Sequence, residues 1–228
     1  VELYDGTLGV SRAFVRRHER PVGQLQWRSD LARLFPDPGD VAGKRWATGA
    51  LIGRNLFLTV AHAFEQPDDR WRLPRQPQGD QPIRPEDAAR GMQVNFDYQE
   101  APGGRLRREQ SYPVLELLEY RLGGLDVAIV RLGGNPGDTY GFAALATEDA
   151  RERDLLCLIQ HPEGQPKRLD AGPLFHSHGD LIGYDAIDTL GGSSGAGILQ
   201  VSTGLLVGVH THGGCDDRAI GHNHGVKM

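Results

Sequence analysis

A glycine-rich stretch, Gly191-Gly192-Ser193-Ser194-Gly195-Ala196-Gly197, lies near the end of this chain and places Ser194 between glycines. Two earlier segments give this serine a context. His62 closes the apolar run Phe57-Leu58-Thr59-Val60-Ala61, and Asp126 opens the apolar run Val127-Ala128-Ile129-Val130. A nucleophile, a base and an orienting acid therefore occur in the chain order His, Asp, Ser, which is one of three known orders of a catalytic triad.

The chemistry of these three side chains is complementary. A serine hydroxyl is a poor nucleophile at neutral pH and needs a base within hydrogen-bond reach, and histidine titrates in the right range. We expect His62 to take the proton of Ser194 and to deliver it later to the leaving group. Asp126 would hold the ring tautomer and stabilise the imidazolium.

Composition excludes several classes of protein. The 228 residues suffice for one large or two small cores, and 39% hydrophobic with 24% charged residues is ordinary for a soluble globular protein. A net charge of −5 argues against binding to nucleic acid. No apolar run approaches the roughly 20 residues that a membrane helix needs, so we expect no membrane segment.

The ends and the cysteines of the chain bear on its origin. The chain begins at Val1 and not at Met, so we expect that something upstream was removed or not included: a signal, a propeptide or another domain of a larger parent protein. No apolar signal region is visible, and the two cysteines, Cys157 and Cys215, are too few for a disulfide-stapled scaffold. Cys157 lies in an apolar run and is expected to be a buried thiol, although pairing with Cys215 stays open. These features favour the cytoplasm over secretion by a bacterium.

Short apolar runs separated by clusters of glycine and proline predict an all-β chain. The sequence contains 31 glycines and 14 prolines. Two six-stranded antiparallel β-barrels are expected, in residues 1–135 and 136–228, which together form one catalytic domain. The expected strands are 22–26, 47–52, 56–59, 92–97, 114–119 and 127–132 in the first half, and 155–160, 168–175, 181–186, 197–201, 205–209 and 225–228 in the second. Helix is expected only at 30–35 and 85–90.

The local contexts of the triad candidates resemble those of chymotrypsin-fold serine proteases. Thr59-Val60-Ala61-His62 matches their Thr-x-Ala-His, residues 126–132 match Asp-x-Ala-x-x-x-Leu, and Gly192-Ser193-Ser194-Gly195 matches Gly-x-Ser-Gly. The resemblance runs from about residue 21 to the C-terminus. It implies a serine endopeptidase that cleaves polypeptides through an acyl-enzyme, without metal or organic cofactor, at a site between the two barrels. It also implies an oxyanion hole made by the backbone N–H groups of Gly192 and Ser194.

One departure from trypsin-type enzymes indicates a branch of the family. Ser193 stands where those enzymes carry an aspartate that pairs with a newly cut N-terminus, so we expect no activation switch of that kind. The chain is similar to the bacterial glutamyl-endopeptidase-like branch. That resemblance implies that Thr189 and His210 contact an acidic substrate side chain, that the amine of Val1 neutralises it, and that substrate backbone pairs with Thr211, His212 and Gly213. Cleavage after Glu, or less favourably Asp, is therefore expected.

Three other interpretations stay open. The fold can serve as a catalytically inactive binding or scaffold module, which the presence of all three triad residues disfavours. It can also be a regulatory protease module that a partner domain activates. The third is a structural zinc site, since several zinc-type ligands cluster near the C-terminus: His210, His212, Cys215, His222 and His224. The arginines at 105, 107 and 108 are interpreted as a solvated hairpin, not as a binding patch.

Overall fold

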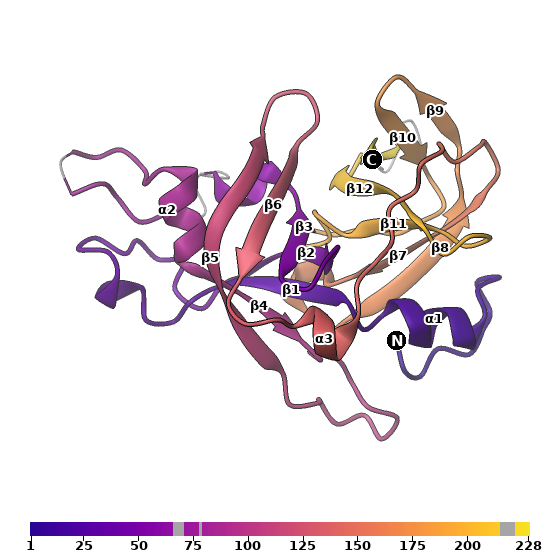
Figure 1. Cartoon of the computed structure of the whole chain (residues 1–228), viewed down its shortest axis with the longest axis horizontal. Helices are drawn as coiled ribbons and strands as arrows, with labels where there is room; N and C mark the ends of the chain where they lie inside the picture. Colours follow the sequence, from indigo (N-terminus) through magenta and orange to yellow (C-terminus); the bar gives the residue numbers. More distant parts are fainter. Residues whose placement is uncertain (66–70, 78, 215–221) are drawn as a thin grey trace.

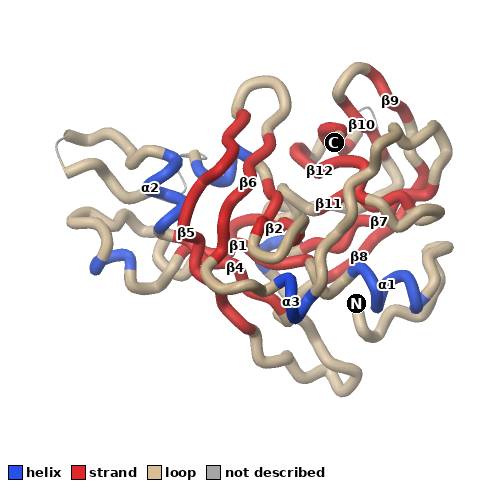
Figure 2. Tube along the Cα trace, viewed as in Figure 1, coloured by secondary structure: helices blue, strands red, loops and turns tan. Residues whose placement is uncertain are grey.

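A computed structural model of the chain describes residues 1–65, 71–77, 79–214 and 222–228. Strands dominate it, in two groups that lie side by side, with few and short helices (Figures 1 and 2). The elements are, in chain order, α1 (Arg12–His18), β1 (Val22–Trp27), η1 (Leu31–Arg33), β2 (Arg45–Leu51), β3 (Leu56–Thr59), η2 (Ala61–Phe64), α2 (Pro85–Arg90), β4 (Met92–Phe96), β5 (Gln110–Arg121), β6 (Val127–Leu132), α3 (Gly137–Tyr140), β7 (Leu155–Gln160), η3 (Pro162–Gly164), β8 (Arg168–Pro173), β9 (His176–His178), β10 (Leu181–Tyr184), β11 (Gly197–Gln200), β12 (Leu206–His212) and β13 (Asn223–Lys227).

The first six strands close into an antiparallel barrel in the order β1-β2-β3-β6-β5-β4. Alternate residues of β6 are buried, which is the period-two pattern of a strand with one face on a core. Strand β5 is longer than the predicted 114–119. Its ends pair with β4 and β6 through mostly exposed residues, and such residues give no hydrophobic signal. The predicted six-stranded barrel is confirmed.

The remaining strands form one curled antiparallel sheet in the order β8-β7-β11-β12-β13-β10-β9. It encloses a separate apolar core that includes Leu156, Ile182, Tyr184 and Ile198. The all-β class is confirmed, whereas the described residues of this half form seven strands where six were predicted. The additional strand, β9, has the sequence His-Ser-His, which contains no apolar residue, and it is held by pairing with β10.

The two halves share buried residues along their seam. The larger core cluster joins Phe57 and Leu58 of the barrel to Cys157, Leu206 and Val209 of the sheet. Residues 133–146, which cross from the barrel to the second sheet, contain α3 and then form a parallel bridge with β12. Side chains on either side of this seam are therefore held in fixed relation, which a site built from both halves needs.

The N-terminal segment contains a helix that the sequence did not reveal. Helix α1 begins after Ser11, whose side chain accepts a hydrogen bond from the backbone N–H of Phe14 at 3.1 Å. Only Val15 of this helix is buried, so no apolar periodicity marks it. Just beyond it, the backbone carbonyl of Glu19 accepts a 2.6 Å hydrogen bond from the buried ammonium of Lys167, which ties the segment to the second sheet.

Two further expectations concern Cys157 and the membrane. Cys157 is a buried free thiol, as predicted, and burial raises its pKa to about 12. Cys215 lies outside the described residues. Within the described part of the chain, none of the helices has the length and apolar character needed to cross a membrane.

Candidate active site

His62 lies just beyond the end of β3, in the short helix η2 at the rim of the barrel. The buried side chains of Ala61 and Ala63 hold η2 against the core. The side chain of His62 itself is 36% exposed. The imidazole is thus anchored through its backbone and open on one side.

Asp126 precedes β6, and the antiparallel pairing of β3 with β6 brings it to His62. Its φ of 52° lies in the left-handed region, which aspartate tolerates better than most residues. The Asp126 carboxylate contacts His62 twice: Oδ1 accepts from the backbone N–H at 2.9 Å, and Oδ2 lies 2.6 Å from Nδ1. This geometry favours the tautomer with a proton on Nδ1, which leaves Nε2 able to accept one.

The electrostatics of Asp126 agree with this pairing. Burial raises the pKa of the carboxyl, but the hydrogen bonds and the charge of His62 outweigh burial and hold the pKa below its ordinary value. The carboxylate, whose side chain is 10% exposed, is therefore ionised at neutral pH and able to stabilise a positive imidazolium.

Ser194 comes from the second half, on the loop that leads into β11, and the first barrel holds this loop. The backbone N–H of Thr48 in β2 donates to the Ser194 carbonyl at 2.8 Å, and the Thr48 carbonyl accepts from the Thr59 hydroxyl at 2.7 Å. One residue of β2 thus bonds both to the serine loop and to the strand that ends just before His62. Among the described residues no hydrogen bond joins the Ser194 hydroxyl to His62, and such bonds are often long in a site without substrate.

Gly195 follows the serine because no larger residue fits there. Its φ is +90°, and a Cβ would lie 2.0 Å from the carbonyl oxygen of Thr48. Its N–H donates to the carbonyl of His210 at 2.8 Å. The glycine after the candidate nucleophile is therefore required by the close approach of the two halves.

The peptide group between Gly191 and Gly192 is oriented by the loop of η3. The carbonyl of Gly191 accepts from the N–H of Glu163 at 2.5 Å. A trans peptide directs its carbonyl and its N–H to opposite sides, so the N–H of Gly192 points away from Glu163. Gly192 has a φ of +94°, and its carbonyl accepts from the Thr48 hydroxyl at 2.7 Å. The same hydroxyl accepts from the N–H of His161 at 3.0 Å.

Ser193 is fully buried and needs no ionic partner. Its hydroxyl accepts a hydrogen bond from the N–H of Leu190 at 3.2 Å, and its own N–H donates to the carbonyl of Leu190 at 2.9 Å. The position that resembles the activation aspartate of trypsin-type enzymes is thus satisfied by a local turn.

Thr189 and Gly213 meet at a residue that sequence reasoning missed, Asn223 of β13. The Thr189 hydroxyl donates to Asn223 Oδ1 at 3.1 Å, and the N–H of Gly214 donates to the same oxygen at 3.2 Å. A Cβ on Gly213 would lie within van der Waals contact of both Thr189 and Asn223. The only sequence signal at Asn223 was its pair of flanking histidines, which suggested a metal site instead.

His210 is buried between strands and is neutral. Its Nδ1 lies 2.6 Å from the hydroxyl of Tyr184, a second residue that the sequence did not indicate. Burial, followed by the charges of His212 and His62, lowers the pKa of His210 to about 3. Thr211 is buried as well, and its hydroxyl donates to the carbonyl of His224 at 3.2 Å.

His212, by contrast, is exposed and lies beside the candidate base. The centroids of the His62 and His212 rings are 5.7 Å apart. Within the described residues, the group of metal-ligating side chains that come close together is His62, Asp126 and His212. This group differs from the C-terminal cluster that the sequence suggested for structural zinc. In that cluster His210 contacts Tyr184, His222 packs against Phe175, and Cys215 lies outside the described residues.

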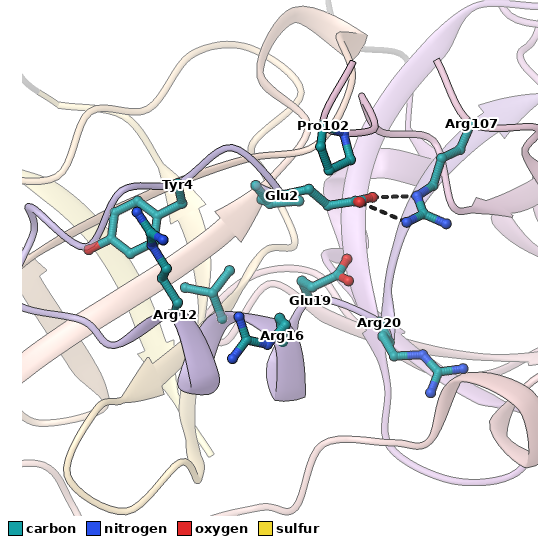
Figure 3. A pocket seen from close by; sticks show the side chains of 10 residues that line it. Glu2, Tyr4, Arg12, Arg16, Glu19, Arg20, Pro102 and Arg107 are labelled. Carbon is teal, nitrogen blue, oxygen red and sulfur yellow. Dashed lines mark hydrogen bonds and ion pairs between the residues drawn. The ribbon is translucent and has the colours of Figure 1, made fainter. Parts of the chain in front are cut away.

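Val1 lies elsewhere, beside α1, in a cavity of about 430 Å³ (Figure 3). Glu2 points across this cavity to Arg107 and pairs with it, so this arginine is not simply solvated. Burial lowers the pKa of the Val1 amine, and Arg168 lowers it further while Glu19 opposes the change. These neighbours are not those of Thr189 or His210, so the structure does not bring Val1 to the other predicted specificity residues.

Similar structures share this architecture. A glutamyl endopeptidase solved in complex with MPD matches with a TM-score of 0.64 and 18% identity, over 96% of this chain and 88% of that one. A serine endoprotease from Yersinia pestis matches with a TM-score of 0.57 and 14% identity, over 94% of this chain and 61% of that one. At these identities the likeness shows the fold alone.

Sequence comparison identifies the family. A secreted RxLR effector protein of Plasmopara viticola is 32% identical over 107 residues, which cover 42% of this chain and only 26% of that protein. The family model of the trypsin-like peptidase domain matches residues 47–209, which make up most of the chain. This range contains both His62 and Ser194. The chain therefore belongs to the trypsin-like peptidase family and has the chymotrypsin fold of its serine endopeptidases.

Proposed function

We propose that the chain hydrolyses peptide bonds with His62, Asp126 and Ser194 as its catalytic triad. The observation that carries the proposal is the 2.6 Å contact between His62 Nδ1 and Asp126 Oδ2, because it leaves Nε2 as the base. The Ser194 hydroxyl attacks the scissile carbonyl while its proton moves to His62. The imidazolium then protonates the leaving amine, which yields an acyl-enzyme, and a water activated by His62 hydrolyses it.

The negative charge that develops on the substrate oxygen requires donors fixed in advance. In this proposal they are the backbone N–H groups of Gly192 and Ser194. The bond from Glu163 to the Gly191 carbonyl supports this role, since it orients the Gly192 peptide before substrate binds. Loss of one such donor typically lowers turnover by about 10²–10³.

The test is hydrolysis of a fluorogenic peptide by the parent chain and matched variants. Ser194→Ala and His62→Ala should each lose activity by several orders of magnitude, while Ser202→Ala, which changes an exposed serine in a turn, should retain it. Retention of activity in Ser194→Ala would exclude the proposed nucleophile. A folded parent without activity on any peptide would support the inactive-module alternative.

The finer proposal is that substrates are cleaved after glutamate. The Thr189 hydroxyl, bonded to Asn223 Oδ1 at 3.1 Å, can turn its proton to a substrate carboxylate, and the Asn223 amide has a second N–H besides the one that it donates to the Ile187 carbonyl. His210 is held neutral by burial, so its contribution is a dipole and not a charge. Substrate backbone would pair with residues 211–214 as an added strand.

This specificity is tested with peptides that differ only before the scissile bond. Glutamate should give the highest kcat/KM, with glutamine as the nearest competitor because the donors are neutral. Thr189→Val should raise KM for the glutamyl peptide more than for a leucyl peptide. A preference for lysine or leucine in the parent chain would overturn the proposed specificity and leave the triad untouched.

A further inference from the structure

The His62–Asp126 pair has a third neighbour that the proposed mechanism does not use. One ligand atom from each of His62, Asp126 and His212 lies within 4.8 Å of the other two. His212 is exposed, and no hydrogen bond to its ring is present among the described residues. Its nitrogens are therefore available to a ligand. The carboxylate is held in place, since its Oδ1 accepts the backbone N–H of His62.

We propose that His62, Asp126 and His212 bind a zinc-type transition-metal ion and that the bound ion reversibly inhibits the protease. Its effect on activity rests on the proposed triad, whereas the binding depends only on the three side chains. Two imidazoles and one carboxylate, with water in the fourth position, are a common ligand set for Zn²⁺. Mg²⁺ and Ca²⁺ prefer all-oxygen sites, so the site selects against them.

The geometry requires only small movements. Two ligands of a tetrahedral zinc ion with bonds of about 2.0–2.1 Å lie roughly 3.3 Å apart. The His62–Asp126 contact of 2.6 Å has to widen, and the separations of up to 4.8 Å have to narrow. The exposed side chain of His212 is free to rotate toward the pair, so it can supply most of the narrowing.

A metal ion on His62 stops catalysis whichever ring nitrogen it occupies. On Nδ1 the ion displaces the ring proton that is hydrogen-bonded to the Asp126 carboxylate. On Nε2 it occupies the lone pair that accepts the proton of Ser194. Chelation restores the free imidazole and with it the activity. His212 is the member of the set that the triad itself does not require.

The binding test uses the Ser194→Ala variant, which cannot digest itself, and a chromophoric chelator that competes for Zn²⁺. The variant should bind one zinc ion at this site, and adding His212→Gln should weaken it at least about 10-fold. The matched control is His178→Gln, which removes another exposed histidine and should leave this affinity unchanged. Thermal unfolding of each variant confirms that it is folded, and Asp126→Asn provides a second ligand change.

The activity test measures peptide hydrolysis in rising Zn²⁺, with each variant compared with its own rate without metal. The parent and His178→Gln should be inhibited at the same concentration and recover with EDTA, and Mg²⁺ should have no effect. His212→Gln should need at least about 10-fold more zinc. Equal zinc sensitivity in His212→Gln, or equal affinity in the binding test, would overturn the inference. Zinc binding by a chain that hydrolyses no peptide would support the site and refute the proposed function instead.

Discussion

The hydroxyl of Thr48 is the point where the first barrel holds the candidate nucleophile loop, and its removal should be costly. The hydroxyl donates to the Gly192 carbonyl at 2.7 Å and accepts from the N–H of His161 at 3.0 Å. Thr48→Val keeps the shape of the side chain but leaves both groups without this partner. A buried N–H without an acceptor costs about 1–3 kcal/mol, and a lost bond to a partly exposed carbonyl about 1 kcal/mol. The free energy of unfolding should therefore fall by about 2–4 kcal/mol.

Activity should fall as well, because Gly192 loses the bond that fixes its peptide group. We expect a decrease in kcat of about 10-fold or more, toward the loss seen when an oxyanion donor is removed, with little change in KM. The assays are urea unfolding and peptide hydrolysis of the parent, Thr48→Val and Thr48→Ser. The serine variant keeps both hydrogen bonds and should retain most of the kcat. Thr48→Val with the stability and kcat of Thr48→Ser would refute this reasoning.

Three further predictions concern residues around the same loop. Gly195→Ala places a Cβ 2.0 Å from a backbone oxygen, so this variant should unfold at a markedly lower urea concentration than a Gly6→Ala control, whose site is open. Equal midpoints of urea unfolding in the two variants would contradict this. Burial lowers the pKa of His210 to about 3, so between that value and about 6.5 the unfolded chain binds one more proton at this residue and stability rises with pH. The His210→Gln variant should therefore show a slope of unfolding free energy against pH that is smaller by about 1.4 kcal/mol per pH unit. An unchanged slope would show that the histidine is charged in the fold. Asn223→Ala removes the acceptor of the Thr189 hydroxyl and should lower kcat/KM for glutamyl peptides about 10-fold, the effect of about 1.4 kcal/mol; an equal loss for leucyl peptides would indicate general damage.

Much of the strand pattern was predictable because apolar runs mark it. The strands at 56–59, 127–132 and 155–160 were predicted with their observed bounds, and most others ended within a few residues of the prediction. Elements without an apolar period escaped: β9 has no apolar residue, and α1 buries only Val15. Their stability comes from strand pairing and from an N-cap, which leave no hydrophobic period in the sequence.

The contact between His62 and Asp126 was predictable because their chain order and local sequence contexts resemble those of the triad in chymotrypsin-fold proteases. The parts played by Thr48 and Asn223 were not. Thr48 acts through a carbonyl on Gly192, far along the chain and in the other half of the fold. Its sequence neighbourhood is that of any buried strand residue. The position of Val1 likewise depends on how α1 packs, which residue type alone does not determine.

The most direct test of the proposed triad is the site at which a fluorophosphonate probe reacts, mapped by mass spectrometry of the digested chain. The account predicts one adduct per chain, on Ser194, formed much more slowly in His62→Gln because the hydroxyl then lacks its base. A folded chain that forms no adduct, or that carries the adduct on another serine with Ser194 unmodified, would contradict it.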